Sequence, residues 1–332
     1  SRLVVPPFEP APLFRGAHAQ TVLVPYLPAK REVGERITVP IEGGALTGRL
    51  HRAMGSAPAR ACVLVLHGIA GTADEPFVHR TARLAQKRGL DALRLDLRGA
   101  GESADCGVPP LFHAGLTADV RAAIELLLAR YERVHLIGFS LGGQIALRTV
   151  GEWGEGAPPG VASVTAVSPP IHLRECATFS ERRAASIYRI YIVRALKQRY
   201  LRARTAMGER FHADLLRSAR TVSDYDAAVV APHFGFRDVE DYYAQASSES
   251  LIDRIAAPTL ILHAADDPLV SVEPVQRVQR RRLPGVRVVV TERGGHVGFY
   301  GRAPAAGDDT RFWAEERAID LAAALERAQV RR

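Results

Sequence analysis

The sequence predicts an α/β fold in which a mostly parallel central sheet is flanked by helices. Short segments rich in β-branched and other apolar residues alternate with stretches long enough for a helix. Before this alternation, two segments joined by Glu42-Gly43-Gly44 predict an antiparallel hairpin that opens the sheet. Strands that alternate with helices form parallel sheets covered on both faces. The expected strands are residues 36–39, 46–51, 62–66, 90–95, 134–137, 161–167, 259–262 and 286–290.

The alternation is interrupted after the strand expected at 161–167. Ser168-Pro169-Pro170 ends that strand, and the stretch that follows is too long for a bare loop. We therefore predict a helical cap over residues 168–233, inserted into a single α/β domain that spans residues 1–332. Because the cap would lie at the carboxyl edge of the sheet, we expect it to cover the functional site. Ile190 and Tyr191 are the expected lining residues of a substrate pocket.

One cap segment, residues 182–204, distributes its apolar side chains all round a helix rather than along one stripe. This pattern weakens the hypothesis that the cap rests on a membrane surface, and peripheral membrane contact remains the alternative. A helix packed between the core and a partner or substrate, with arginine side chains extending outward, explains the pattern equally well.

A nucleophile is expected at Ser140, within the sequence Gly138-Phe139-Ser140-Leu141-Gly142. This segment directly follows an expected strand and precedes a helix. A sharp strand-to-helix turn forces unusual backbone angles on the serine and leaves no room for side chains two residues before and after it. Gly138 and Gly142 occupy those two positions. The N-terminus of the following helix would favour negative charge on a bound acyl oxygen.

The partners of a serine nucleophile are expected downstream, in the order acid and then histidine. The strand at 259–262 is followed by Asp266 and Asp267, and we favour Asp267 because Pro-Leu-Val follows it; Asp266 is the alternative. His296 lies one helix and one strand further on, flanked by glycines. That interval is what a crossover needs to return to the same edge of a parallel sheet.

Two backbone N–H groups are expected to form an oxyanion hole. One belongs to Leu141, directly after the nucleophile, and the other to Ile69, in the loop after the strand at 62–66. His67 is expected to hold this loop by a backbone hydrogen bond rather than to act as a second base. Asp96 and Arg98 are expected to pair and stiffen the turn after the strand at 90–95.

With these residues in place, the chain resembles the α/β-hydrolases and, more narrowly, the YheT-like subfamily of hydrolases. The narrower resemblance rests on residues 14–21 (FRGAHAQT), 67–71 (HGIAG), 113–119 (HAGLTAD) and 235–243 (GFRDVEDYY). The chain departs from the subfamily pattern in the cap, where Tyr225-Asp226 replaces the usual Phe-Asp. The resemblance implies ester hydrolysis, with relatives that act on short-chain esters, acylglycerols or phospholipids.

The composition, with 47% hydrophobic and 24% charged residues, is typical of a soluble globular enzyme. A net charge of +8 raises the question of a nucleic-acid partner. The basic residues are almost all arginine, with lysine only at positions 30, 87 and 197, and no nucleic-acid-binding motif accompanies them. We therefore expect no nucleic-acid partner.

The three cysteines, Cys62, Cys106 and Cys176, are scattered, so they indicate neither a disulfide framework nor a metal site. No cofactor and no metal ion are expected. No run of 18 apolar residues is present, and the N-terminal residues lack the long apolar region of a signal peptide. The expected location is the cytoplasm, with peripheral membrane contact as the alternative stated above. The sequence leaves the oligomeric state open.

The leading functional hypothesis is a cofactor-free serine hydrolase of short- to medium-chain acyl esters or lipid esters, acting through Ser140, Asp267 and His296 and an acyl-enzyme. An acyltransferase using the same three residues is the first alternative. The second is a non-catalytic lipid-binding protein of the same fold, against which the presence of all three residues argues.

Overall fold

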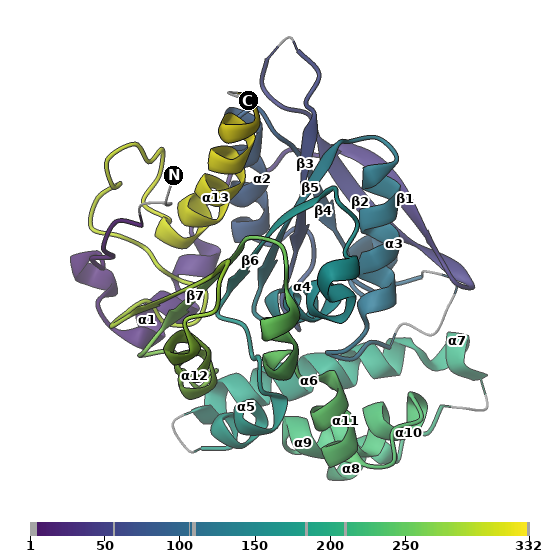
Figure 1. Ribbon diagram of the computed structural model, residues 1–332. Coiled ribbons are helices and arrows are strands. Elements are labelled where there is room, and N and C mark those ends of the chain that lie inside the picture. The colour runs from purple at the N-terminus through teal and green to yellow at the C-terminus, as the bar shows by residue number, and fades with distance from the viewer. Residues whose placement is uncertain are drawn as a thin grey trace.

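The computed structural model describes residues 5–55, 57–105, 107, 111–182, 185–208 and 211–330. Cys106 lies outside these ranges. A twisted central sheet runs through the molecule, helices cover both of its faces, and a layer of further helices lies below one edge (Figure 1). This is the α/β-hydrolase fold expected from the sequence, with its helical insertion after the sixth strand.

The sheet has eight strands in the order β1-β2-β4-β3-β5-β6-β7-β8. The hairpin strands β1 and β2 are antiparallel, β2 also pairs antiparallel with β4, and all later pairings are parallel. All eight expected strands are therefore confirmed. Their bounds are β1 Glu35–Ile41, β2 Gly44–His51, β3 Ala61–Leu66, β4 Asp91–Leu95, β5 Arg133–Phe139, β6 Val161–Val167, β7 Thr259–Ala264 and β8 Val286–Thr291.

Helices α2, α3, α4, α12 and α13 belong to the α/β domain, and α1 precedes it. Their bounds are α1 Ala17–Val22, α2 Pro76–Lys87, α3 Thr117–Leu128, α4 Leu141–Trp153, α12 Glu273–Arg281 and α13 Trp313–Val330. Short 3-10 turns are η1 Pro12–Phe14, η2 Val24–Tyr26, η3 Gly101–Ser103, η4 Gly154–Gly156 and η8 Glu249–Arg254. Within the described ranges, none of the helices combines the length and the apolar character that crossing a membrane requires.

Two hydrophobic cores lie on opposite faces of the sheet. Successive side chains of a strand point to opposite faces, so β3 supplies Leu64 to one core and Val63 to the other. The first core packs against α3 and α4 and continues into the cap, and the second packs against α2 and α13. Both β3 residues are completely buried. This double cover explains why β3 is an uninterrupted apolar run.

The cap lies along the carboxyl ends of the strands (Figure 1). Its helices are α5 Leu173–Ser180, α6 Ser186–Arg202, α7 Arg204–Met207, α8 Leu215–Ser218, α9 Val222–Tyr225, the π-helical turn η7 Asp226–Val230, α10 Ala231–His233 and α11 Val239–Ala246. The helical insertion thus continues past residue 233 into α11, whose Tyr242 and Tyr243 are buried in the first core.

Candidate active site

Ser140 occupies the sharp turn between β5 and α4. Its backbone angles are φ 52° and ψ −120°, a conformation that residues with side chains rarely adopt. A Cβ atom on Gly138 would lie 2.3 Å from the carbonyl oxygen of Gly142, and one on Gly142 would lie 2.6 Å from that of His67. Glycine is therefore required at both positions, for the steric reason that the sequence indicated.

The structure brings Ser140, His296 and Asp267 into one hydrogen-bonded chain. His296 Nε2 lies 2.9 Å from Ser140 Oγ, and His296 Nδ1 lies 2.8 Å from Asp267 Oδ2. With Nδ1–H donated to the carboxylate, Nε2 is free to accept the proton of the serine hydroxyl. A strand-end serine, a loop histidine and a buried carboxylate in this geometry can activate the hydroxyl for nucleophilic attack.

Asp267 is fixed from its other side by backbone amides. Its Oδ1 accepts hydrogen bonds from the N–H groups of Leu269, at 2.8 Å, and Val270, at 3.0 Å. Burial by itself raises the pKa of Asp267, but the neighbouring His296, His263 and the Val270 amide outweigh it, and the pKa is lowered. The carboxylate therefore stays ionised and orients the imidazole.

His263 was not singled out by sequence reasoning, yet it lies behind the carboxylate. Its Nε2 is 3.8 Å from Asp267 Oδ2 and 3.2 Å from the carbonyl oxygen of Val270, to which it donates. Burial lowers the pKa of His263, so a neutral ring packs against the acid. Its position at the end of β7, four residues before Asp267, is the signal that could have identified it.

The loop that carries His296 is held by three side chains that accept from three successive backbone amides. Gly295 N–H donates to Asp266 Oδ1 at 2.9 Å, His296 N–H to Thr21 Oγ1 at 2.8 Å, and Val297 N–H to Ser168 Oγ at 3.2 Å. Gly295 and Val297 have positive φ angles, of 58° and 66°. The contacts thus stabilise a loop in which Val297 has a backbone conformation that is unfavourable for a β-branched residue.

These contacts separate the two candidate acids. Asp267 bonds the imidazole of His296, whereas Asp266 bonds the backbone one residue before it. Neither Thr21 nor Ser168 was singled out as a functional residue from the sequence. Thr21 ends the segment 14–21, whose resemblance to the YheT-like subfamily was the only signal for it.

The loop after β3, which carries Ile69, passes directly over Ser140. Strands β3 and β5 are neighbours in the sheet, so the segments that follow them meet at its carboxyl edge. A Cβ atom on Gly68 would lie 3.4 Å from Cβ of Ser140. Among the residues described, the backbone N–H groups of Ile69 and Leu141 have no protein acceptor. Both amides are therefore available as donors of the kind that an oxyanion hole needs.

His67 holds this loop through backbone hydrogen bonds, as expected. Its Nδ1 lies 2.7 Å from the carbonyl oxygen of Gly68, and its Nε2 accepts from the N–H of Leu97 at 3.1 Å. Burial lowers the pKa of His67 to about 4, so the ring is neutral and presents one donor and one acceptor. His67 therefore ties the loop after β3 to the end of β4.

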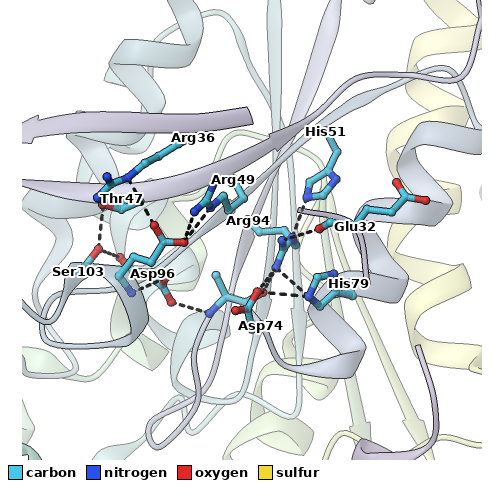
Figure 2. A network of polar contacts seen from close by, with 12 residues as sticks. Glu32, Arg36, Thr47, Arg49, His51, Asp74, His79, Arg94, Asp96 and Ser103 are labelled. Carbon is cyan, nitrogen blue, oxygen red and sulfur yellow. Dashed lines mark hydrogen bonds and ion pairs between the residues drawn. The ribbon is translucent and has the colours of Figure 1, made fainter. Parts of the chain in front are cut away.

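A buried polar network anchors the far end of the same loop. Figure 2 shows Arg94 of β4 between His51, Asp74 and His79, with Nε 2.8 Å from His51 Nε2 and Nη1 2.8 Å from Asp74 Oδ1. Burial, followed by the charge of Arg94, lowers the pKa of both histidines to about 4, so both rings accept hydrogen bonds from the guanidinium.

Asp96 completes this anchor. Its carboxylate accepts from the N–H of Ala73 at 2.7 Å and from that of Glu102 at 3.0 Å (Figure 2). The expected pairing of Asp96 with Arg98 is wrong, because Arg98 instead forms a bidentate pair with Asp119 of α3. Asp96 therefore holds the loop after β3, and Arg98 holds helix α3.

A cavity of about 410 Å³ lies between the sheet and the cap and reaches Ser140 and His296. Its walls are mainly apolar and aromatic, with Ile69 and Leu141 on the sheet side and α6 on the cap side. Of the two residues predicted to line a substrate pocket, Tyr191 lies in the cavity wall, whereas Ile190 is not among the lining residues and is 58% exposed. Ile187, Tyr188, Ile192 and Leu196 are the other α6 residues that face the cavity.

The cap is also tied to the segment that supports His296. Tyr188 of α6 stacks on His18 of α1, and its hydroxyl lies 2.6 Å from His18 Nδ1. In the described part of the chain, no group of three or more His, Cys, Asp or Glu side chains is arranged to hold a metal ion.

Comparison with known proteins agrees with this architecture. The profile of the alpha/beta hydrolase fold family matches residues 62–303. The Escherichia coli protein named "Putative esterase YheT" is 30% identical over 262 residues, which cover 78% of this chain and 75% of that protein. The monoacylglycerol lipase of Saccharomyces cerevisiae is 28% identical over 294 residues, which cover 82% of this chain and 64% of the lipase.

Solved structures share the fold at lower sequence identity. The esterase Pf2001 of Pyrococcus furiosus superposes with a TM-score of 0.52 at 19% identity, covering 81% of this chain and 91% of the esterase. Est1E of Butyrivibrio proteoclasticus superposes with a TM-score of 0.55 at 14% identity, covering 90% of this chain and 99% of that chain.

Proposed function

Because the chain belongs to the α/β-hydrolase family, as the match over residues 62–303 establishes, we propose that it is a serine-dependent carboxylic ester hydrolase. The observation that carries the proposal is the hydrogen-bonded chain from Ser140 Oγ through His296 to Asp267, with distances of 2.9 and 2.8 Å. It opens onto a mainly apolar cavity, as an ester substrate requires.

In the proposed reaction, Ser140 Oγ attacks the ester carbonyl carbon while His296 Nε2 takes the hydroxyl proton. Asp267 stabilises the imidazolium that forms. The N–H groups of Ile69 and Leu141 stabilise the negative charge on the carbonyl oxygen. His296 then gives the proton to the leaving alcohol, which departs and leaves an acyl-enzyme. A water molecule, deprotonated by His296, releases the acid and restores Ser140.

The cavity supports short- to medium-chain acyl esters or lipid esters as substrates. Its volume of about 410 Å³ lies in the range of small-molecule sites, and its lining contains neither Lys nor Arg among the residues described. Relatives named as a monoacylglycerol lipase and as phospholipases are consistent with an acyl substrate. An acyltransferase would need an alcohol to replace water at the acyl-enzyme, and the same residues would serve it.

Exposed apolar side chains at the cap support contact with an anionic lipid surface. Ile187 and Tyr191 line the cavity while their side chains are 77% and 57% exposed. Val22 and Leu23, at the end of α1, are also exposed, and α1 contacts α6 through His18 and Tyr188. The net charge of +8 favours anionic headgroups. Cosedimentation with anionic but not with neutral vesicles is the expected result.

Labelling with a fluorophosphonate probe tests the proposed chemistry. The wild-type protein should be labelled at Ser140 and should release p-nitrophenol from p-nitrophenyl esters, whereas Ser140→Ala should do neither at a comparable rate. Product analysis with an added alcohol separates a hydrolase from an acyltransferase. Absence of labelling and turnover in the folded wild-type protein would favour a non-catalytic lipid-binding role.

A further inference from the structure

Asp226 is a buried carboxyl group in the wall of the active-site cavity that the proposed reaction does not use. It is the first residue of the π-helical turn η7, and the residue is 7% exposed. Single π-helical turns inside helical segments are rare and often occur at functional sites. A carboxyl group buried in a largely apolar wall is unfavourable unless a partner compensates for the lost water.

The protein supplies only part of that compensation. The hydroxyl of Tyr243, on α11, donates to Asp226 Oδ2 at 2.8 Å, and both residues line the cavity. In the described part of the chain this is the one hydrogen bond to the carboxyl group. A carboxylate has about four acceptor positions, so Asp226 retains hydrogen-bonding capacity beside the cavity.

Arg174, the cation whose charge acts on Asp226, forms its hydrogen bonds with another carboxylate. Arg174 of α5 lies over the ring of Tyr243, 4.6 Å from its centroid, and its guanidinium forms a bidentate pair with Glu240. Burial raises the pKa of Asp226 to about 7, against the hydrogen bond from Tyr243 and the charge of Arg174, which lower it. Near neutral pH both forms of the carboxyl group are therefore present.

The chemistry of the lining selects the kind of group that Asp226 can bind. Asp226 and Glu75 both line the cavity, and none of its described lining residues is Lys or Arg, so an anionic substrate group would be unfavourable there. A cationic group would match only the ionised carboxylate. A hydroxyl group can donate to the carboxylate and accept from the protonated acid, so it matches both forms.

We propose that Asp226 and Tyr243 form a polar subsite in the cavity wall that binds a hydroxyl group of the ester substrate, an inference that rests on the proposed esterase function. The hydroxyl can be carried by the acyl chain or by the alcohol part of the ester. The surrounding apolar wall then binds the hydrocarbon, and the subsite gives the enzyme a preference for hydroxylated over plain esters.

The test compares kcat/KM for ester pairs that differ by one hydroxyl group. Ethyl 6-hydroxyhexanoate against ethyl hexanoate tests the acyl side, and 3-hydroxypropyl butyrate against propyl butyrate tests the alcohol side. Shorter and longer hydroxy acids vary the distance from the ester. A preference of about tenfold or more for the hydroxylated member of at least one pair is expected, since a hydrogen bond to a charged group contributes about 1.5 to 3 kcal/mol.

Variants then assign the preference to the subsite. Asp226→Leu should bring the ratio of the two kcat/KM values close to one, and Asp226→Asn, which still accepts and donates, should retain part of it. Asp224→Leu is the matched control: Asp224 caps α9 by accepting from the N–H groups of Arg220 and Thr221, so its loss weakens the same segment away from the cavity. It should leave the ratio unchanged.

A binding measurement keeps this result separate from the esterase proposal. In calorimetric titrations, the Ser140→Ala variant should bind the hydroxylated ester more tightly than the plain ester. This result is expected whether or not the wild-type protein hydrolyses the two esters. Equal kcat/KM and equal affinity for the two members of every pair would overturn the subsite. So would an unchanged ratio in Asp226→Leu, or a stronger preference for an ω-ammonium ester than for the hydroxy ester.

Discussion

Gln20 and Tyr300 form a reciprocal pair of hydrogen bonds that joins α1 to the loop carrying His296. Tyr300 N–H donates to Gln20 Oε1 at 2.8 Å, and Gln20 Nε2 donates to the carbonyl oxygen of Tyr300 at 3.2 Å. The packing is close, because a Cβ atom on Gly298 would lie 2.4 Å from the carbonyl oxygen of Gln20. The N-terminal segment therefore supports the candidate active site, although Gln20 lies 280 positions from Tyr300 in the sequence.

Thr21→Val should lower kcat by about tenfold with a smaller change in KM, because small displacements of a reacting group have large effects on rate. Valine keeps the shape of threonine but removes the hydroxyl that accepts the N–H of His296. Steady-state kinetics on a p-nitrophenyl ester measures the effect. Thr21→Ser keeps the hydroxyl and should restore most of kcat. Equal losses in both variants would show that Thr21 acts through packing alone.

The glycine spacing and the chain order were sufficient to predict which three side chains, those of Ser140, Asp267 and His296, the structure brings into one hydrogen-bonded chain. Gly138 and Gly142 are required by contacts between neighbouring segments, which a local pattern records. Asp267 and His296 follow strands at one edge of the sheet, so their meeting with Ser140 follows from the topology.

The supporting residues could not be predicted in the same way. Thr21 and Ser168 act on the His296 loop from distant parts of the chain, and no local periodicity relates them to it. Arg98 had an acid two residues away but pairs with Asp119 across the fold. On α6, an apolar pattern on all sides of the helix did not reveal that Ile192 faces the cavity and Ile190 faces solvent.

Replacing each of the two adjacent acids by its amide should separate their roles. Asp267→Asn should lower kcat by about 10³-fold or more, since an amide neither stabilises the imidazolium nor fixes its tautomer. Asp266→Asn should lower it by less than about tenfold, because an amide oxygen can still accept the N–H of Gly295. Fluorophosphonate labelling rates and ester turnover both report this ranking. The reverse ranking would transfer the acid's role to Asp266.

Glu326 should make the stability of the protein depend on acidic pH. It joins α13 to β5, accepting from Arg133 Nε at 2.6 Å and lying 3.0 Å from His135 Nε2. Burial raises its pKa, but these contacts outweigh burial and lower the pKa from 4.5 to about 2. The folded state therefore favours the ionised form, and this stabilisation is present above pH 4.5 and lost as the pH falls toward 2.

Glu326→Gln should lower Tm at neutral pH by about 1 to 2 °C, as expected for a loss of about 1 kcal/mol after solvent screening in a chain of 332 residues. The difference from the wild type should shrink as the pH falls below 4.5, since the wild-type carboxylate is then being protonated. Glu35→Gln is the matched control, because Glu35 pairs with Arg52 at the surface and both side chains are exposed. A constant Tm difference across this pH range would contradict the assigned coupling.

The same substitution at two positions of α6 tests whether the cap sets the acyl-chain preference. Ile192 lines the cavity, whereas Ile190, two residues earlier, is not in its lining and is 58% exposed. Ile192→Ala should therefore shift the ratio of kcat/KM between short and medium acyl chains by about tenfold, because one or two methylenes of pocket contact contribute about 1 to 3 kcal/mol. Ile190→Ala should change that ratio by less than about twofold. A p-nitrophenyl ester series from acetate to decanoate measures both. If Ile192→Ala changes all chain lengths equally, the acyl chain does not contact α6, and the cap acts only as a cover that excludes water from Ser140.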